Sequence, residues 1–65
     1  MIMCLSKYYN RKVQVMVDDM TIMGIVTDYF YPEDNPNGEE SIIIHTSSAD
    51  DVELYASEIT RISVI

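Results

Sequence analysis

The segment from Lys12 to Thr27, KVQVMVDDMTIMGIVT, constrains the fold of this chain more than any other. Two alternating runs flank the acidic pair Asp18-Asp19, and their recurring residues are Val13, Val15, Val17, Ile22, Gly24 and Val26. Alternation of β-branched residues on both sides of a short polar break predicts a β-hairpin. Because a residue without Cβ tolerates strong coiling and close backbone approach, Gly24 predicts a bulge or sharp bend in the second strand.

The length of 65 residues predicts one domain, residues 1–65, with a marginal core. Cys4 is the only cysteine, so the chain has no internal disulfide and no Cys/His cluster for a structural zinc. Its neighbours Met3 and Leu5 indicate a small hydrophobe rather than an activated thiol. Hydrophobic residues make up 48% of the chain, which predicts that some apolar side chains face a partner.

The net charge is −7, from eleven acids against four bases. Three of the bases, Lys7, Arg11 and Lys12, lie in the first twelve residues, and Arg61 is the fourth. A field of this sign repels phosphate backbones and anionic lipid, so we expect neither a nucleic-acid nor a membrane partner. The apolar start is too short for a signal peptide or a membrane span, and with the free cysteine it predicts a cytoplasmic protein.

The rest of the chain divides into short strands and turns. The spacing of apolar residues over 2–9 predicts a short helix, with an extended segment as the alternative. Residues 32–40 are predicted to form a solvated loop, because Asn35-Pro36 and Asn37-Gly38 are strong turn signals. A 3₁₀-type turn is predicted at about 57–60. The predicted strands are 12–17, 21–31, 41–46, 51–56 and 61–65.

This order of elements resembles the Sm-like proteins within the Src-homology type of small barrel. The resemblance implies an all-β fold, a five-stranded, strongly bent antiparallel barrel preceded by a short helix. Sm-like RNA binders typically carry an aspartate and then an asparagine after the second strand, and an Arg-Gly or similar pair between the last two. Here the acid comes early, at Asp28, and 56–58 is Ala-Ser-Glu. We therefore transfer the fold from the resemblance and leave the RNA site behind.

No residue pattern predicts catalysis or a bound cofactor. The loop 33–38 has some features of a calcium loop, but Ile44 stands where the bidentate glutamate would be. We therefore predict a solvated turn and no metal site. His45 is the only histidine. No Ser or Cys stands with it in a recognised catalytic sequence and no acid lies at a meaningful spacing, so it is predicted to be structural. The chain is predicted not to be an enzyme and to need no cofactor.

Two groups of residues are candidates for contact with a partner. Tyr29 and Tyr31 alternate with Phe30, which predicts aromatic surface on one face beside acidic residues. Such a setting favours a protein or basic peptide partner over nucleic acid. The simpler interpretation is a core Phe30 between half-buried tyrosines. The second group, Met23, Ile25 and Ile43, faces outward and must be covered by the N-terminal helix, by a second copy of the chain, or by both.

These observations predict a non-enzymatic interaction module that self-associates and binds another protein. The residues predicted to bind partners are Tyr29, Tyr31, Met23, Ile25 and Ile43. The alternative is a degenerate Sm-like nucleic-acid binder that uses Lys7, Arg11 and Lys12.

Overall fold

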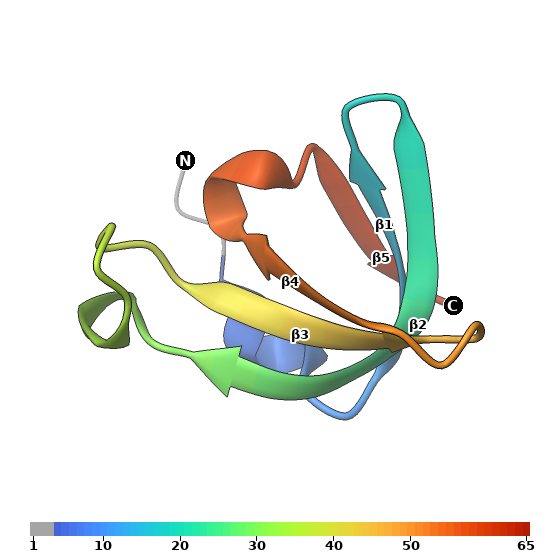
Figure 1. Cartoon of the computed structure of the whole chain (residues 1–65), viewed down its shortest axis with the longest axis horizontal. Coiled ribbons are helices and arrows are strands. Elements are labelled where there is room, and N and C mark those ends of the chain that lie inside the picture. The colour runs from blue at the N-terminus through green and yellow to red at the C-terminus, as the bar shows by residue number, and fades with distance from the viewer. Residues whose placement is uncertain (1–3) are drawn as a thin grey trace.

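Five strands form one antiparallel sheet in the order β4-β3-β2-β1-β5 in the computed structural model, which describes residues 4–65 (Figure 1). The predicted strands are confirmed to within one residue at each end. Short 3₁₀ turns are the only helical elements in the described part of the chain. The elements are η1 (Leu5–Tyr8), β1 (Lys12–Val17), β2 (Met20–Phe30), η2 (Pro32–Asp34), β3 (Ser41–Thr46), β4 (Asp51–Tyr55), η3 (Ala56–Glu58) and β5 (Arg61–Val64).

The predicted N-terminal helix is a single 3₁₀ turn, η1, where it falls within residues 4–65. The first residues of the predicted range, 2 and 3, lie outside the described part of the chain. Four residues cannot sustain helical structure alone, so η1 depends on its contact with the sheet. Leu5 makes that contact, because its side chain is fully buried in the core.

The hairpin between β1 and β2 turns at Asp18-Asp19, as the alternation predicts. Val17 pairs with Met20 across the turn, and Asp18 has φ 53°. Aspartate tolerates this left-handed backbone better than most residues, because its short side chain can hydrogen-bond locally.

Strand β2 is long enough to belong to both halves of the sheet. It pairs with β1 from Met20 to Ile25 and with β3 from Gly24 to Phe30, and it bends visibly along its length (Figure 1). In the sheet order, β4 and β5 are the two edges, and no ladder joins them within residues 4–65. The sheet is therefore bent but not closed, and closure into a barrel stays a prediction.

Gly24 lies close against β3. A Cβ there would lie 2.8 Å from Ile44 Cγ2 and 2.9 Å from the carbonyl carbon of His45. The predicted close approach is thus confirmed. The bulge, however, is not at Gly24: the register shifts between Val26 and Asp28, so that Thr27 is the unpaired extra residue.

The bulge at Thr27 overturns the expectation of a core Phe30. Without the bulge, Gly24, Val26 and Phe30 would share one face of the strand. Because the bulge adds one residue, the side chain that faces the core after it is that of Tyr29. Tyr29 stands opposite the buried Ile42 and packs against the core, whereas Phe30 is only half-buried and belongs to no core contact.

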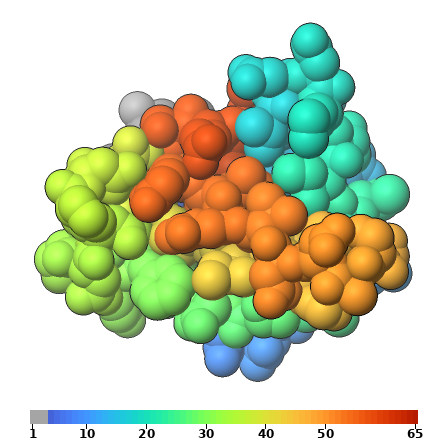
Figure 2. Space-filling view, viewed as in Figure 1, coloured from blue at the N-terminus to red at the C-terminus, as the bar shows by residue number. Residues whose placement is uncertain are grey.

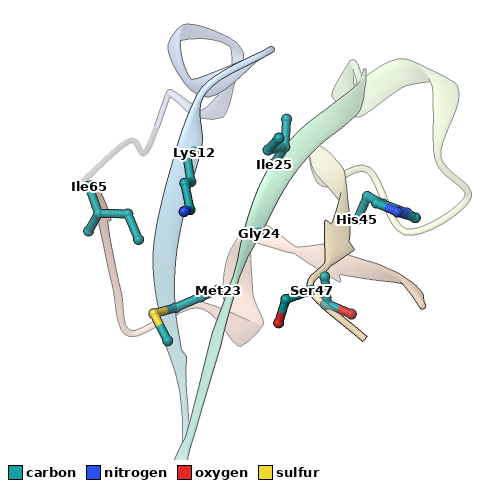
Figure 3. A pocket seen from close by; sticks show the side chains of 8 residues that line it. Lys12, Met23, Gly24, Ile25, His45, Ser47 and Ile65 are labelled. Carbon is teal, nitrogen blue, oxygen red and sulfur yellow. The ribbon is translucent and has the colours of Figure 1, made fainter. Parts of the chain in front are cut away.

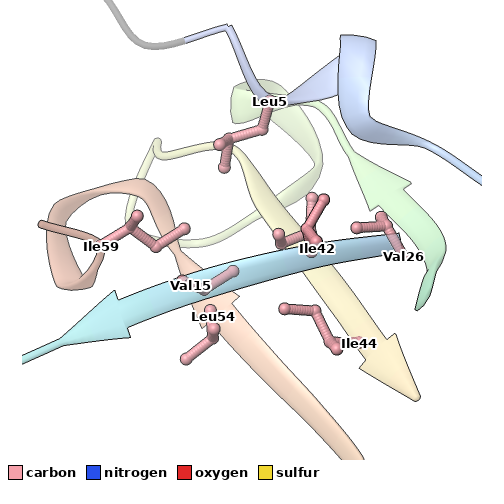
Figure 4. Packing of buried hydrophobic residues seen from close by; sticks show 8 residues of the cluster. Leu5, Val15, Val26, Ile42, Ile44, Leu54 and Ile59 are labelled. Atoms are coloured by element: carbon pink, nitrogen blue, oxygen red, sulfur yellow. The ribbon is translucent and has the colours of Figure 1, made fainter. Parts of the chain in front are cut away.

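The buried hydrophobic side chains pack together into one core (Figure 4). Its eight members come from η1, β1, β2, β3, β4 and the segment before β5, and they are Leu5, Val13, Val15, Val26, Ile42, Ile44, Leu54 and Ile59. Cys4 does not join them, because it is exposed.

The loop 31–40 and the β3–β4 turn project on opposite sides of β4 (Figure 2). The loop is held by its own polar groups. Asn35 Nδ2 donates to the carbonyl of Glu39 at 2.7 Å and to Ser41 Oγ at 3.0 Å, and the buried Ser41 hydroxyl donates to Glu53 at 3.1 Å. Gly38 adopts φ 73°, which suits the Asn37-Gly38 turn signal.

Candidate functional site

The outer surface of the sheet carries a hollow of about 480 Å³, which we call the outer-face hollow (Figure 3). Strands β1, β2 and β3 and the residue after β5 supply its lining, which consists of Lys12, Met23, Gly24, Ile25, His45, Thr46, Ser47 and Ile65. No aspartate or glutamate side chain is among these residues. Asp51 lies against the lining, with its Oδ1 2.8 Å from Nδ1 of His45.

Strand register brings the apolar residues of the outer-face hollow together. The backbone N–H of Ile65 donates to the Lys12 carbonyl at 3.0 Å, and Lys12 stands opposite Ile25. Figure 3 shows the Lys12 side chain between Ile65 and Ile25, with Met23 nearby. The exposed fractions are 51% for Met23, 47% for Ile25 and 54% for Ile65. Apolar side chains this exposed and this close form a surface suited to contact with a protein.

A second hollow, of about 330 Å³, lies between η1 and the end of β2. We call it the tyrosine hollow, and it is lined by Ser6, Tyr9, Asp28, Tyr29 and Tyr31. The rings of Tyr29 and Tyr31 meet edge to face, with centroids 5.1 Å apart and planes 84° apart. They form two walls at nearly a right angle, a favourable geometry for an aromatic pair.

Carboxylates surround Tyr29 on two sides. Asp28 Oδ1 accepts the backbone N–H of Tyr29 at 3.1 Å, and Glu40 Oε1 accepts the Tyr29 hydroxyl at 3.3 Å. Burial, together with the charge and hydrogen bond of Glu40, raises the pKa of Tyr29 to about 12. Tyr29 is therefore a neutral phenol at physiological pH, held in place by its partner Glu40.

The structure divides the predicted partner-binding residues between the two hollows. Met23 and Ile25 lie together in the outer-face hollow, and Tyr29 and Tyr31 lie together in the tyrosine hollow. Ile43 lines neither: it is half-buried, opposite Asp28 on β2 and Glu53 on β4.

Sequence reasoning missed Tyr9 and Ile65 as site residues. Tyr9 reaches the tyrosine hollow because the next residue, Asn10, donates its N–H to the Val26 carbonyl at 2.8 Å and fixes this segment against β2. The contact between Asn10 and Val26 joins residues far apart in the sequence, so no local sequence pattern predicts it. Ile65 could have been inferred from the pairing of β5 with β1, which places it beside Lys12.

His45 has an acid partner that its spacing in the sequence did not predict, because the pairing of β3 with β4 places Asp51 opposite it. His45 Nδ1 lies 2.8 Å from Asp51 Oδ1, a cross-strand pair whose side chains are 50% and 68% exposed. Within residues 4–65, no group of three or more His, Cys, Asp or Glu side chains is placed to hold a metal ion. No helix in the same range is long and apolar enough to cross a bilayer.

Comparison with protein-family models, with curated proteins and with solved structures gives no match for this chain.

Proposed function

We propose that this chain is a non-enzymatic interaction module that self-associates and binds a protein partner. We also propose that its bent sheet belongs to the Sm-like type of small barrel. The strand order, the long shared β2 and the single 3₁₀ turn before β5 support that assignment.

The observation that carries self-association is the outer-face hollow. Two molecules that each carry a charge of −7 repel one another, so they approach most easily where carboxylate side chains are few. The residues that line the outer-face hollow include none, and they present Met23, Ile25 and Ile65, each about half exposed. The occupant that we propose for it is therefore a second copy of the same chain.

The sheet edges support the same proposal. Among residues 4–65, strands β4 and β5 each have a hydrogen-bonded neighbour strand on one side only. Free N–H and C=O groups on an edge are a template for pairing with another strand. The outer-face hollow extends to Ile65, directly after β5, so a second copy seated there would lie beside this edge. Contact between faces and pairing between edges can thus belong to one interface, related by a two-fold axis.

Light scattering at tens of micromolar tests the proposal. We expect at least twice the chain mass of 7.5 kDa. Met23→Ser and Ile25→Ser should each give the monomer, because both side chains would be buried at the interface. Tyr31→Ser is the control, since Tyr31 is 59% exposed and lines the other hollow, which shares no residue with the outer-face hollow. A mass of 7.5 kDa for the unmodified chain at every concentration would refute self-association.

A further inference from the structure

The tyrosine hollow has a shape that its own chain does not fill. Tyr9 and Tyr31 are 49% and 59% exposed, and Tyr29 and Tyr31 stand as perpendicular walls beside the Asp28 carboxylate. Each aromatic ring carries partial negative charge on its faces, so a ring beside a carboxylate attracts cations and repels anions.

The two carboxylates near Tyr29 differ in how their oxygens are used. Asp28 uses Oδ1 to accept the Tyr29 N–H, and no hydrogen bond to its Oδ2 is present in the described residues. Glu40 is occupied differently, because its Oε1 accepts both the Leu5 N–H and the Tyr29 hydroxyl. Asp28 is therefore the acid that remains able to pair with a ligand, while Glu40 fixes the ring of Tyr29.

The chain's own nearby base does not occupy the tyrosine hollow. Lys7 Nζ lies 5.3 Å from the ring centroid of Tyr8, in η1, and Lys7 is not among the residues that line the hollow. This contact is itself a cation–π pair, so the same chemistry already occurs beside the hollow.

We propose that the tyrosine hollow binds the guanidinium group of an arginine in a peptide segment of the partner protein. This inference rests on the proposed function, because it names the chemistry of the protein partner. Arginine fits better than lysine for two reasons: its planar group stacks on aromatic faces, and its fork of N–H donors matches a carboxylate such as Asp28.

Three matched peptides test this assignment. Each is a short Gly/Ser peptide with one central residue, which is arginine, lysine or the neutral isostere citrulline. Binding is followed by the backbone amide NMR signals of Tyr9, Asp28, Tyr29 and Tyr31. We expect the arginine peptide to shift these signals at millimolar concentration, the lysine peptide to bind more weakly, and the citrulline peptide to cause no shift. Equal shifts from arginine and citrulline would overturn the proposal.

Variants separate a specific site from general attraction to an acidic protein. Tyr31→Phe keeps the ring and should bind as the parent does, whereas Tyr31→Leu should weaken binding by about fivefold. Asp28→Asn should remove the preference for arginine over lysine. Asp19→Asn removes the same charge at the β1–β2 turn and should leave that preference intact. An equal effect of Asp19→Asn and Asp28→Asn would show attraction by net charge alone and would refute the site.

Three further outcomes are informative. If a uridine- or adenosine-rich oligonucleotide shifts the same signals and the arginine peptide does not, the hollow is a base-stacking surface and the inference is wrong. The peptide titration is repeated on Met23→Ser. If the unmodified chain is monomeric at every concentration but binds the arginine peptide, self-association is refuted and this inference stands. If the unmodified chain is a dimer and binds none of the three peptides, this inference is refuted and self-association stands.

Discussion

The carboxylate of Glu40 holds the backbone of Leu5, which lies 35 positions earlier in the chain. Its Oε1 accepts the Leu5 N–H at 2.6 Å in a partly buried setting, and the same oxygen accepts the Tyr29 hydroxyl. One acid from the loop before β3 thus ties the N-terminal turn to the end of β2. Because Leu5 is fully buried, this contact also helps to close the core.

Glu40→Ala should therefore destabilise the fold. The change leaves the Leu5 N–H without its acceptor, which costs about 1–3 kcal/mol. For a domain of this size, each kcal/mol lowers the Tm by roughly 4–8 °C. Thermal melts followed by circular dichroism measure the effect. Glu33→Ala, which removes an exposed acid from η2, is the control and should melt with the parent. If Glu40→Ala and Glu33→Ala have similar melting temperatures, Glu40 does not have this stabilising role.

Gly24→Val and Gly24→Ala should both be strongly destabilising. The sequence alone suggests that alanine is tolerated better, but even one Cβ would come within 3 Å of Ile44 and of the His45 backbone. Backbone cannot yield as a flexible side chain can, so the overpacking penalty of about 1–3 kcal/mol applies to alanine as well.

Gly38→Ala provides the comparison for Gly24. In the described part of the chain, no atom beyond Gly38 and its two chain neighbours lies within 4 Å of the position where its Cβ would be, so its φ of 73° is what resists the change. The cost of a left-handed alanine is about 1–2 kcal/mol. We expect the melting temperature to fall less for Gly38→Ala than for either Gly24 variant. The reverse order would mean that the close approach of β2 to β3 is not real.

Tyr29 should be the last of the five tyrosines to ionise. Its pKa is raised from 10.0 to about 12 by burial and by Glu40. The folded state therefore keeps this proton to higher pH than the unfolded state does. Its contribution to stability is complete below pH 10 and is lost as the pH rises toward 12.

The near-ultraviolet absorbance of tyrosinate follows this titration. Tyr29→Phe should remove the latest step, and Glu40→Gln should move that step to lower pH because the neighbouring charge is gone. If all five tyrosines ionise together, the environment of Tyr29 is not the one described here.

Nucleic acid should bind only weakly at physiological salt. Of the three bases in the N-terminal region, Lys7 lies over the Tyr8 ring and Lys12 lines the outer-face hollow. With a net charge of −7, phosphate contacts are few and sensitive to salt. Fluorescence anisotropy with a short labelled oligonucleotide at about 150 mM salt measures this. Sub-micromolar affinity would favour the nucleic-acid alternative.

Much of the fold was predictable from local patterns. The alternation of Val13 and Val15, and of Ile42 and Ile44, places successive side chains on opposite faces of a strand, so strand limits and the core face followed directly. The turns at Asp18-Asp19 and Asn37-Gly38 were readable because few other residues adopt their backbone conformations at low cost. The exposure of Met23 and Ile25 also followed from parity alone.

Tertiary structure decided which surfaces these elements build. The bulge at Thr27 depends on how β2 meets β3, and by shifting the register it exchanged the roles of Tyr29 and Phe30. Tyr9 joined the tyrosine hollow through a backbone contact of its neighbour with Val26. Local sequence determines the period and the turns, because these depend on adjacent residues. The two hollows depend on contacts between residues far apart in the chain, and only the folded sheet brings those residues together.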